Sequence, residues 1–442
     1  MNKIEQLRNA GAAEQARAIV RSEIDSSALL AAEALAIAEQ NPRLNAFVQI
    51  LSTVHKPGKR SLQRSSLAGT TFAVKDNLDV KGLATHAGLA AWNAVPAKSD
   101  ASAVTRLKQA GLVLTGKTNM SAMALGASTH NKDFGDCFNP WRIGYSAGGS
   151  SGGSASAVAA GLVGIALGTD TMGSVRIPAA FCGIVGFKPS WGQIAVDGLV
   201  PLCKPLDHIG VLSRTVEDAS LAFSILRSDE TTIKKPNHSI SGTASIGILE
   251  IYDKLSLQPQ VASSYKNACK LLEAQGYDLK PVDPGEINLS STRRAGLLLC
   301  EAELLSTLEG VYPEYRQRLP EDLVKLLDYI QGQSDEKLQE ASDQLTNARR
   351  FFETWFNTVD AVLIPTSSYT AFPMNVPVPA DIADLTVIAN ILGSPAISLP
   401  LLPAKTDINA LPVGVQLMGR YGDDDTLLLL AGTLSSILSD ST

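Results

Sequence analysis

The chain has 442 residues, of which 45% are hydrophobic and 19% charged, with a net charge of −6. This composition excludes global disorder, because disordered chains combine low hydrophobicity with high net charge. It also disfavours a protein that binds nucleic acid through a basic surface, since 44 Asp and Glu outnumber 38 Lys and Arg. The length fits one large globular unit, or two.

Several further classes of protein are disfavoured by the residue pattern. No apolar run reaches the roughly 18 residues of a membrane-spanning helix, and the charged N-terminus lacks the apolar block of a signal peptide. Five cysteines without tight spacing favour the reducing cytoplasm over a disulfide framework. We expect no metal site, because no CxxC occurs and the histidines are not at ligand spacing: His55, His86, His130, His208 and His238.

The first part of the chain is predicted to be helical. An Ala- and Leu-rich helix is expected over residues 28–40, with Ser26 and Ser27 as its cap and Pro42 as its stop. The apolar segment at 45–51 then predicts a strand.

From residue 67 onward, strands and helices alternate. After an exposed polar loop over 52–66, a short buried strand is predicted at 71–74, and Lys75 follows it directly. A capped helix over 99–111 and a buried strand over 112–115 come next. Such alternation is typical of an α/β protein.

The most unusual stretch spans residues 144–174, where five glycines fall between Gly144 and Gly153. This loop is expected to open an apolar helix at 155–160, followed by a strand at 163–167 and a second glycine-bearing turn at 168–174.

The second half predicts more strands and helices after a polar linker at 225–243. Strands are expected at 245–249, 359–365, 395–400 and 413–418, and helices at 261–275, 334–356 and 423–438.

The Gly/Ser loop at 148–154 fits a linker, a phosphate cradle or a catalytic loop. A linker would not run straight into a buried helix. Neither the GxxxxGK[ST] pattern nor GxGxxG after a strand is present, which disfavours a nucleotide site.

The second turn favours catalysis. Ser174 follows a segment able to aim several backbone N–H groups at one point, as an oxyanion hole requires. A nucleophilic serine needs a base, and the glycine segments contain no histidine, which leaves His130 and His208 as candidates. A buried lysine can replace histidine when burial lowers its pKa, and Lys75 lies where such a lysine is expected.

The segment GGSSGGSASAVAAGLVGIALGTDTMGSVRIPAAFCGIVGFKP (residues 148–189) closely resembles the signature of the amidase signature family. Other segments in register with that family are FAVKDN (72–77), LTGKTNM (114–120), FGDCFNP (134–140), LDHIGVLSRTVED (206–218), GSPAISLP (393–400) and LPVGVQLM (411–418). The family uses a Ser–cis-Ser–Lys triad.

The resemblance implies a role for each matching residue. Lys75 matches the base, Ser150 the bridging serine after a cis Gly149–Ser150 bond, and Ser174 the nucleophile. The backbone N–H groups of Thr171, Met172, Gly173 and Ser174 match the oxyanion hole, and Gly149 and Met172 are expected to bind substrate. No cofactor and no metal are implied. Met172 departs from the family, which usually has glycine there.

Other polar residues near these motifs are assigned structural roles. Asp170 and Arg176 are predicted to form a buried pair that holds the turn, and His208 to be a packed loop residue. Ser151 and Ser154 are expected to cap the helix or to support it by hydrogen bonds. For Asn119 and Ser128, a place in the pocket and a role in a turn stay equally open. The cysteines are expected to be inert and mostly buried.

The implied fold is a single α/β domain over residues 1–442, with a large twisted mixed sheet flanked by helices. Its catalytic core is expected at about 67–225, a variable substrate-side region at 226–357, and the last strands and helix at 358–442. The implied function is hydrolysis of a C–N amide bond, of the linear-amide class, in a small or medium substrate.

Three alternatives remain at this stage. One is the glutamine-hydrolysing A subunit of a tRNA-dependent amidotransferase, although its glutamine-binding pattern is not found at 311–345. The others are a hydrolase of urea-like amides such as biuret or allophanate, and a non-catalytic binding protein. We expect a small-molecule amide as partner, no nucleic acid and no membrane, and partner subunits only for the amidotransferase. A homodimer stays open.

Overall fold

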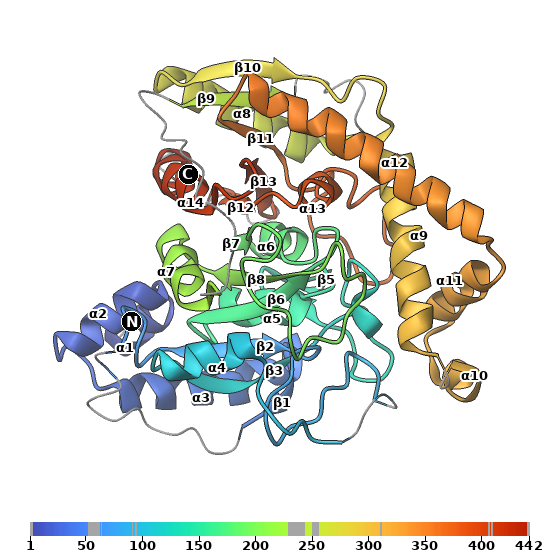
Figure 1. Ribbon diagram of the computed structural model, residues 1–442. Helices are drawn as coiled ribbons and strands as arrows, with labels where there is room; N and C mark the ends of the chain where they lie inside the picture. Colours follow the sequence, from blue (N-terminus) through green and yellow to red (C-terminus); the bar gives the residue numbers. More distant parts are fainter. Residues whose placement is uncertain are drawn as a thin grey trace.

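In the described part of the chain, eleven strands form one mixed sheet, in the order β1-β3-β2-β6-β8-β7-β12-β13-β11-β9-β10 (Figure 1). Its strands are β1 (Phe47–Ile50), β2 (Thr71–Lys75), β3 (Val113–Thr118), β6 (Ile165–Asp170), β7 (Val185–Lys188), β8 (His208–Ser213), β9 (Ser245–Leu249), β10 (Asp278–Val282), β11 (Ala361–Pro365), β12 (Ala396–Leu401) and β13 (Val413–Met418). A separate hairpin pairs β4 (Phe138–Asn139) with β5 (Arg142–Ser146). The structure is a computed structural model, and it describes residues 3–51, 62, 64–90, 92, 95–228, 244–249, 256–309, 312–404, 407 and 410–439.

The helices surround the sheet. They are α1 (Lys3–Arg8), α2 (Ala12–Val20), α3 (Ser26–Leu44), α4 (Ser102–Gln109), α5 (Gly152–Ala159), α6 (Arg176–Cys182), α7 (Val216–Leu226), α8 (Pro259–Ala274), α9 (Leu289–Thr307), α10 (Tyr312–Tyr315), α11 (Glu321–Gln331), α12 (Asp335–Glu353), α13 (Val387–Leu392) and α14 (Asp424–Ser439). None of the helices within the described ranges is long and apolar enough to cross a membrane.

Because β2 and β6 are neighbouring parallel strands, their carboxyl ends lie side by side. Strand β2 lies between β3 and β6 and is parallel to both. The pairs from β6 to β11 along the sheet are antiparallel, and β9 is parallel to both β11 and β10. The chain therefore has the mixed α/β sheet that the resemblance implied, and the last residues of β2 and β6 share one sheet edge.

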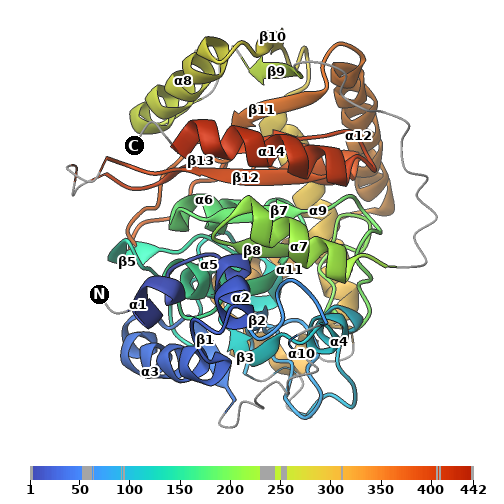
Figure 2. The same cartoon turned by 90° about the vertical axis from the view of Figure 1, so that its left-hand side faces the viewer.

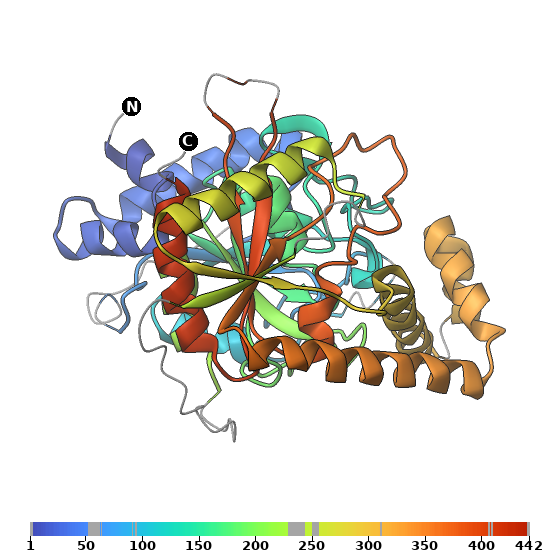
Figure 3. The same ribbon diagram turned by 90° about the horizontal axis from the view of Figure 1, so that it is seen from above.

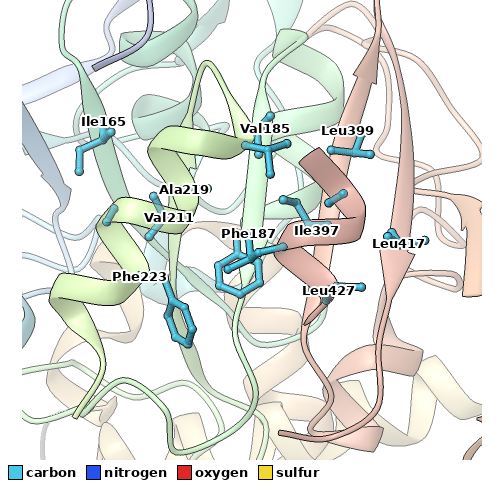
Figure 4. Close-up of a cluster of buried hydrophobic side chains, with 14 of the residues drawn as sticks. Ile165, Val185, Phe187, Val211, Ala219, Phe223, Ile397, Leu399, Leu417 and Leu427 are labelled. Carbon is cyan, nitrogen blue, oxygen red and sulfur yellow. The ribbon is translucent and has the colours of Figure 1, made fainter. Parts of the chain in front are cut away.

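Apolar side chains alternate between the two faces of the sheet, as the pleat requires. On one face, Val211 and Phe187 pack under α7 and α14, together with Phe223 of α7 (Figures 2 and 4). On the other face, Leu212 and Ala166 pack against α5. The sheet is therefore covered on both sides, and its central strands are buried.

Helices α9 to α12 form a second structural region, which we call the helical arm. Figures 1 and 3 show α12 running outward from the sheet, with α10 and α11 at its far end. The arm contributes Leu304, Leu327 and Ile330 to a buried apolar cluster, which we call the arm cluster. This cluster also includes Met120 and Val387 from outside the arm, so the arm packs against the body of the protein.

Several details correct the sequence predictions. The cap of α3 is Asp25, whose carboxylate accepts from the Ser27 N–H at 2.7 Å, and Pro42 lies inside the last turn instead of ending the helix. Strand β6 continues to Asp170, so the second turn is shorter than 168–174. Strands β7 and β8 and helices α6, α7, α9 and α11 were not predicted. Most of the loop expected at 52–66 and of the linker at 225–243 lies outside the described residues.

Candidate active site

Lys75 is the last residue of β2, and its side chain is 0% exposed. Its Nζ donates to Ser150 Oγ at 2.7 Å and to Thr169 Oγ1 at 2.8 Å. Burial lowers the pKa of Lys75 to about 7, although the nearby carboxylates of Asp170 and Asp207 act to raise it. A substantial fraction of Lys75 is therefore neutral near pH 7, and a neutral amine can accept a proton.

Ser150 follows a cis bond to Gly149, as the resemblance implied. The backbone at Gly149 approaches another segment so closely that a Cβ there would lie 2.7 Å from Ser128 N, which explains the glycine. The next residue, Ser151, donates its backbone N–H to the Ser174 carbonyl at 3.2 Å. The two glycine-bearing segments of the sequence therefore meet at these serines.

Asp170 organises the turn that carries Ser174. Its carboxylate accepts the backbone N–H of Gly173 at 2.8 Å and that of Val175 at 3.2 Å. Arg176 forms two hydrogen bonds of 3.0 Å with the same carboxylate, and both side chains are 0% exposed. Burial alone would raise the pKa of Asp170, but the Arg176 guanidinium lowers it well below its usual range. The predicted structural pair is confirmed.

The same contacts reduce the number of backbone N–H groups available for the predicted oxyanion hole. The Gly173 amide is occupied by the Asp170 carboxylate. Gly173 itself has φ +125, and a Cβ there would lie 2.2 Å from Thr386 Oγ1, so only glycine fits. Of the four amides proposed, those of Thr171, Met172 and Ser174 remain as candidate donors.

Ser174 is half-buried and lines a cavity of about 390 Å³ together with Gly149 and Met172. The rest of the lining comes from distant parts of the chain. These are the loop at 124–127, residues of α9 and α11, the segment at 378–383, and Ile177 and Leu202. The lining is mainly apolar, and its charged members are Arg293 and Asp322. Sequence reasoning did not find these two residues, because the arm carries no recognisable motif.

Met172 faces the helical arm from the turn that carries Ser174. Cys300 Sγ lies 3.9 Å from Met172 Sδ, and a Cβ on Gly296 would lie 3.4 Å from Met172 Cε. Thr386 Oγ1 donates to the Met172 carbonyl at 2.7 Å and fixes the backbone. The side chain at this position, where the family usually has none, therefore fills space between the turn and α9.

Most of the remaining polar candidates have structural contacts. Ser151 and Ser154 donate their hydroxyls to backbone carbonyls of β6, at 3.2 and 3.0 Å, and so fasten α5 to the sheet. Ser151 is the N-cap residue of α5, but its hydroxyl makes no capping hydrogen bond. Asn119 donates to the carbonyls of Asn45 and Gly135, and Ser128 Oγ accepts from a backbone N–H two residues on. Neither residue lines the cavity described above.

His208 and the five cysteines are buried in the structure. His208 is buried on β8, with Nδ1 2.7 Å from the Leu206 carbonyl, and burial lowers its pKa well below the usual value. It is a packed residue as predicted, although it lies in a strand and not in a loop. All five cysteines are buried. Among the described residues, no cluster of His, Cys, Asp or Glu could hold a metal ion.

Comparison with known proteins confirms the resemblance. The model of the family described as Amidase matches residues 29–428, and the chain belongs to that family. The A subunit of glutamyl-tRNA(Gln) amidotransferase of Synechococcus sp. (strain CC9311) is 35% identical over 407 residues, covering 83% of this chain and 82% of that protein.

Solved structures agree over nearly the whole chain. The structure of 6-aminohexanoate cyclic dimer hydrolase complexed with substrate has a TM-score of 0.85 at 26% identity, covering 98% of this chain and 97% of that one. The A subunit of glutamyl-tRNA(Gln) amidotransferase from Thermotoga maritima has a TM-score of 0.81 at 30% identity, covering 96% of this chain and 93% of that one.

Proposed function

We propose that the protein hydrolyses a C–N amide bond through an acyl-enzyme on Ser174. The Ser174 proton passes to Ser150 while the Ser150 proton passes to neutral Lys75, and Ser174 Oγ bonds to the carbonyl carbon. The proton then returns through Ser150 to the leaving nitrogen, and the C–N bond breaks. Water attacks the acyl ester by the same relay, which releases the acid and restores Ser174.

The observation that carries this proposal is the buried contact between Lys75 and Ser150 beside the cavity that Ser174 lines. An amide needs an acid at its leaving nitrogen as well as a base at its nucleophile, because an unprotonated amine leaves poorly. A lysine with a pKa near 7 can take a proton in the first step and return it in the second.

The donors we propose for the oxyanion are the backbone N–H groups of Thr171, Met172 and Ser174. The Asp170–Arg176 pair supports this role by fixing the turn before the substrate arrives. Preset donors stabilise developing negative charge because they need no reorganisation during the reaction.

The cavity supports an apolar acyl group of small to medium size. Its apolar lining includes Met172, Leu297, Cys300 and Leu326, and its volume suits a small organic molecule. We propose that Met172 and α9 together limit the depth of this pocket.

A second candidate function is suggested by the relatives. Several are named as the A subunit of a glutamyl-tRNA(Gln) amidotransferase, so this chain could act on glutamine within a complex. The mainly apolar cavity favours the free amidase, because a pocket that binds glutamine would present more polar groups to its charged and amide ends.

The test is an activity screen of the purified chain on aliphatic amides, aryl amides, glutamine and biuret, with detection of ammonia or amine. We expect turnover of apolar amides by the chain alone and none by Ser174→Ala. Turnover of glutamine only after partner subunits are added would favour the amidotransferase. Retained turnover by Ser174→Ala would contradict the proposal.

A further inference from the structure

The contacts of Lys75 extend beyond the proposed triad. Thr169 Oγ1 lies 2.8 Å from Lys75 Nζ and 3.1 Å from Asn77 Nδ2. Thr169 comes from β6, the strand next to β2, and Thr169 and Asn77 are both buried. Lys75 therefore touches two hydroxyls, those of Ser150 and Thr169.

A neutral amine can take a proton from only one of these two hydroxyls, because it has a single lone pair. A neutral lysine has two N–H donors and one lone pair, whereas each hydroxyl has one proton and two lone pairs. If Thr169 donated to Lys75, the lone pair would be used and Ser150 could not pass its proton to the amine. If Thr169 accepts from Lys75, the lone pair remains for Ser150.

The structure assigns Thr169, with Asn77 behind it, as the positioning residue that accepts an N–H of Lys75 and turns the amine lone pair toward Ser150. This inference rests on the proposed Ser174 mechanism. The Asn77 amide supports it, because Asn77 Oδ1 is a buried acceptor with no hydrogen-bond partner among the described residues. In the structure Asn77 Nδ2 donates to Thr169 Oγ1. A 180° turn of the amide would instead bring Oδ1 to the Thr169 proton, and Thr169 could then only accept from Lys75.

The charges around the Lys75 amine predict the direction in which its pKa should move when Thr169 is replaced. The carboxylates that act on Lys75 are Asp170, at the end of β6, and Asp207, just before β8, and both favour the cation. Thr169 also favours the cation, since a hydroxyl oxygen that accepts from a charged amine stabilises it. Removing that oxygen should lower the pKa of Lys75 further, while both carboxylates remain in place.

The experiment is a pH profile of kcat and KM for Thr169→Val and Thr169→Ser on an amide that the wild type hydrolyses. We expect Thr169→Val to lower kcat by about 10- to 100-fold with little change in KM, as for other misplaced catalytic groups. Its acid limb should move to lower pH, and Thr169→Ser should restore both the rate and the limb. If Thr169→Val does not fold, Thr169→Ala removes the same hydroxyl and allows the same comparison.

Thr115→Val is the matched control, because Thr115 is also a buried strand threonine but donates to the Phe72 carbonyl at 3.1 Å. Its acid limb should equal that of the wild type. An unshifted limb in Thr169→Val, with a uniform loss at every pH, would overturn the positioning role. A wild type without amide turnover would instead refute the proposed function itself.

Discussion

The cavity beside Ser174 has one wall of strand ends and turns and another wall of helices. The first wall includes Gly149 and the turn of Ser174, which is fastened by Asp170, and the buried residues Ser150 and Lys75 adjoin it. The second wall is the helical arm, where α9 and α11 present apolar side chains such as Leu297 and Leu326. The first wall depends on specific hydrogen bonds, and the second on the packing of apolar volume.

This difference separates chemistry from substrate choice. Changes in the first wall should alter the rate for every substrate, because each group there has fixed partners. Changes in the second wall should alter the ranking of substrates, because apolar packing tolerates substitutions of similar volume.

Loss of the base should give the largest effect. We expect Lys75→Ala to lower amide turnover by about 10²- to 10⁴-fold, the usual contribution of general acid–base catalysis. An activated ester should suffer less, because its leaving group needs no proton. Parallel rate measurements on a matched amide and ester test this, and equal losses on both would argue against the relay.

Arg176→Met should cost about 3–5 kcal/mol of stability, because it leaves Asp170 as an uncompensated buried charge. Its other partners, Gln416 Oε1 at 2.7 Å and Asn390 Oδ1 at 2.6 Å, would also lose a donor. Chemical denaturation measures the loss. Arg349→Ala is the control, since Arg349 forms an exposed ion pair with Glu353 and should change stability by less than about 1 kcal/mol.

The pH dependence should follow Lys75. Its pKa is lowered to about 7, so the neutral base predominates above that pH and the cation below it. We expect kcat/KM to rise about tenfold per pH unit below the pKa and to level off above it. A profile that is flat between pH 5 and 9, on a substrate with rate-limiting chemistry, would exclude Lys75 as the base.

Two neighbouring leucines of α11 allow a sharper comparison within the arm. Leu327 is 0% exposed in the arm cluster, whereas Leu326 lines the cavity. We expect Leu327→Ala to lower stability by about 2–5 kcal/mol. Leu326→Ala should raise KM for bulky acyl groups and leave stability nearly unchanged. Melting curves and KM values for both variants check this, and the reverse assignment of effects would contradict the two-wall description.

Met172 joins the two walls, and its effect should be the subtlest. Met172→Gly opens space toward Gly296 and Cys300, so we expect bulkier acyl groups to gain relative to small ones. The variant should also lose stability, since glycine increases the entropy of the unfolded chain. Relative turnover across a series of acyl sizes is the measurement. An unchanged ranking with uniformly lower rates would assign Met172 to packing alone.

Sequence reasoning located the parts of the fold that carry local signals. Strand β13 is predicted with its observed bounds, because four of its six residues are large and apolar: Val413, Val415, Leu417 and Met418. Strand β7 was not predicted because it contains Gly186 and Lys188, and Lys188 is tolerated only through its hydrogen bonds to the carbonyls of Ser394 and Pro189. The order of the strands in the sheet could not be predicted either, because it depends on contacts between residues that are distant in sequence.

In the candidate site, too, only residues with a local sequence signal could be predicted. Lys75, Ser150 and Ser174 were found because glycine spacing and family motifs mark them. Thr169 and Arg293 were not, because a buried threonine or a helical arginine has no distinctive pattern of its own. Their contacts come from β2 and from Asp384, which are distant in sequence.

The central claim is that Ser174 is the nucleophile activated through Ser150 and Lys75. Labelling with a fluorophosphonate, followed by peptide mapping, tests it most directly. We expect a single adduct on Ser174 in the wild type, none in Ser174→Ala, and much slower labelling in Lys75→Ala. An adduct on another residue, or full amide turnover by a protein that the reagent does not label at Ser174, would contradict the claim.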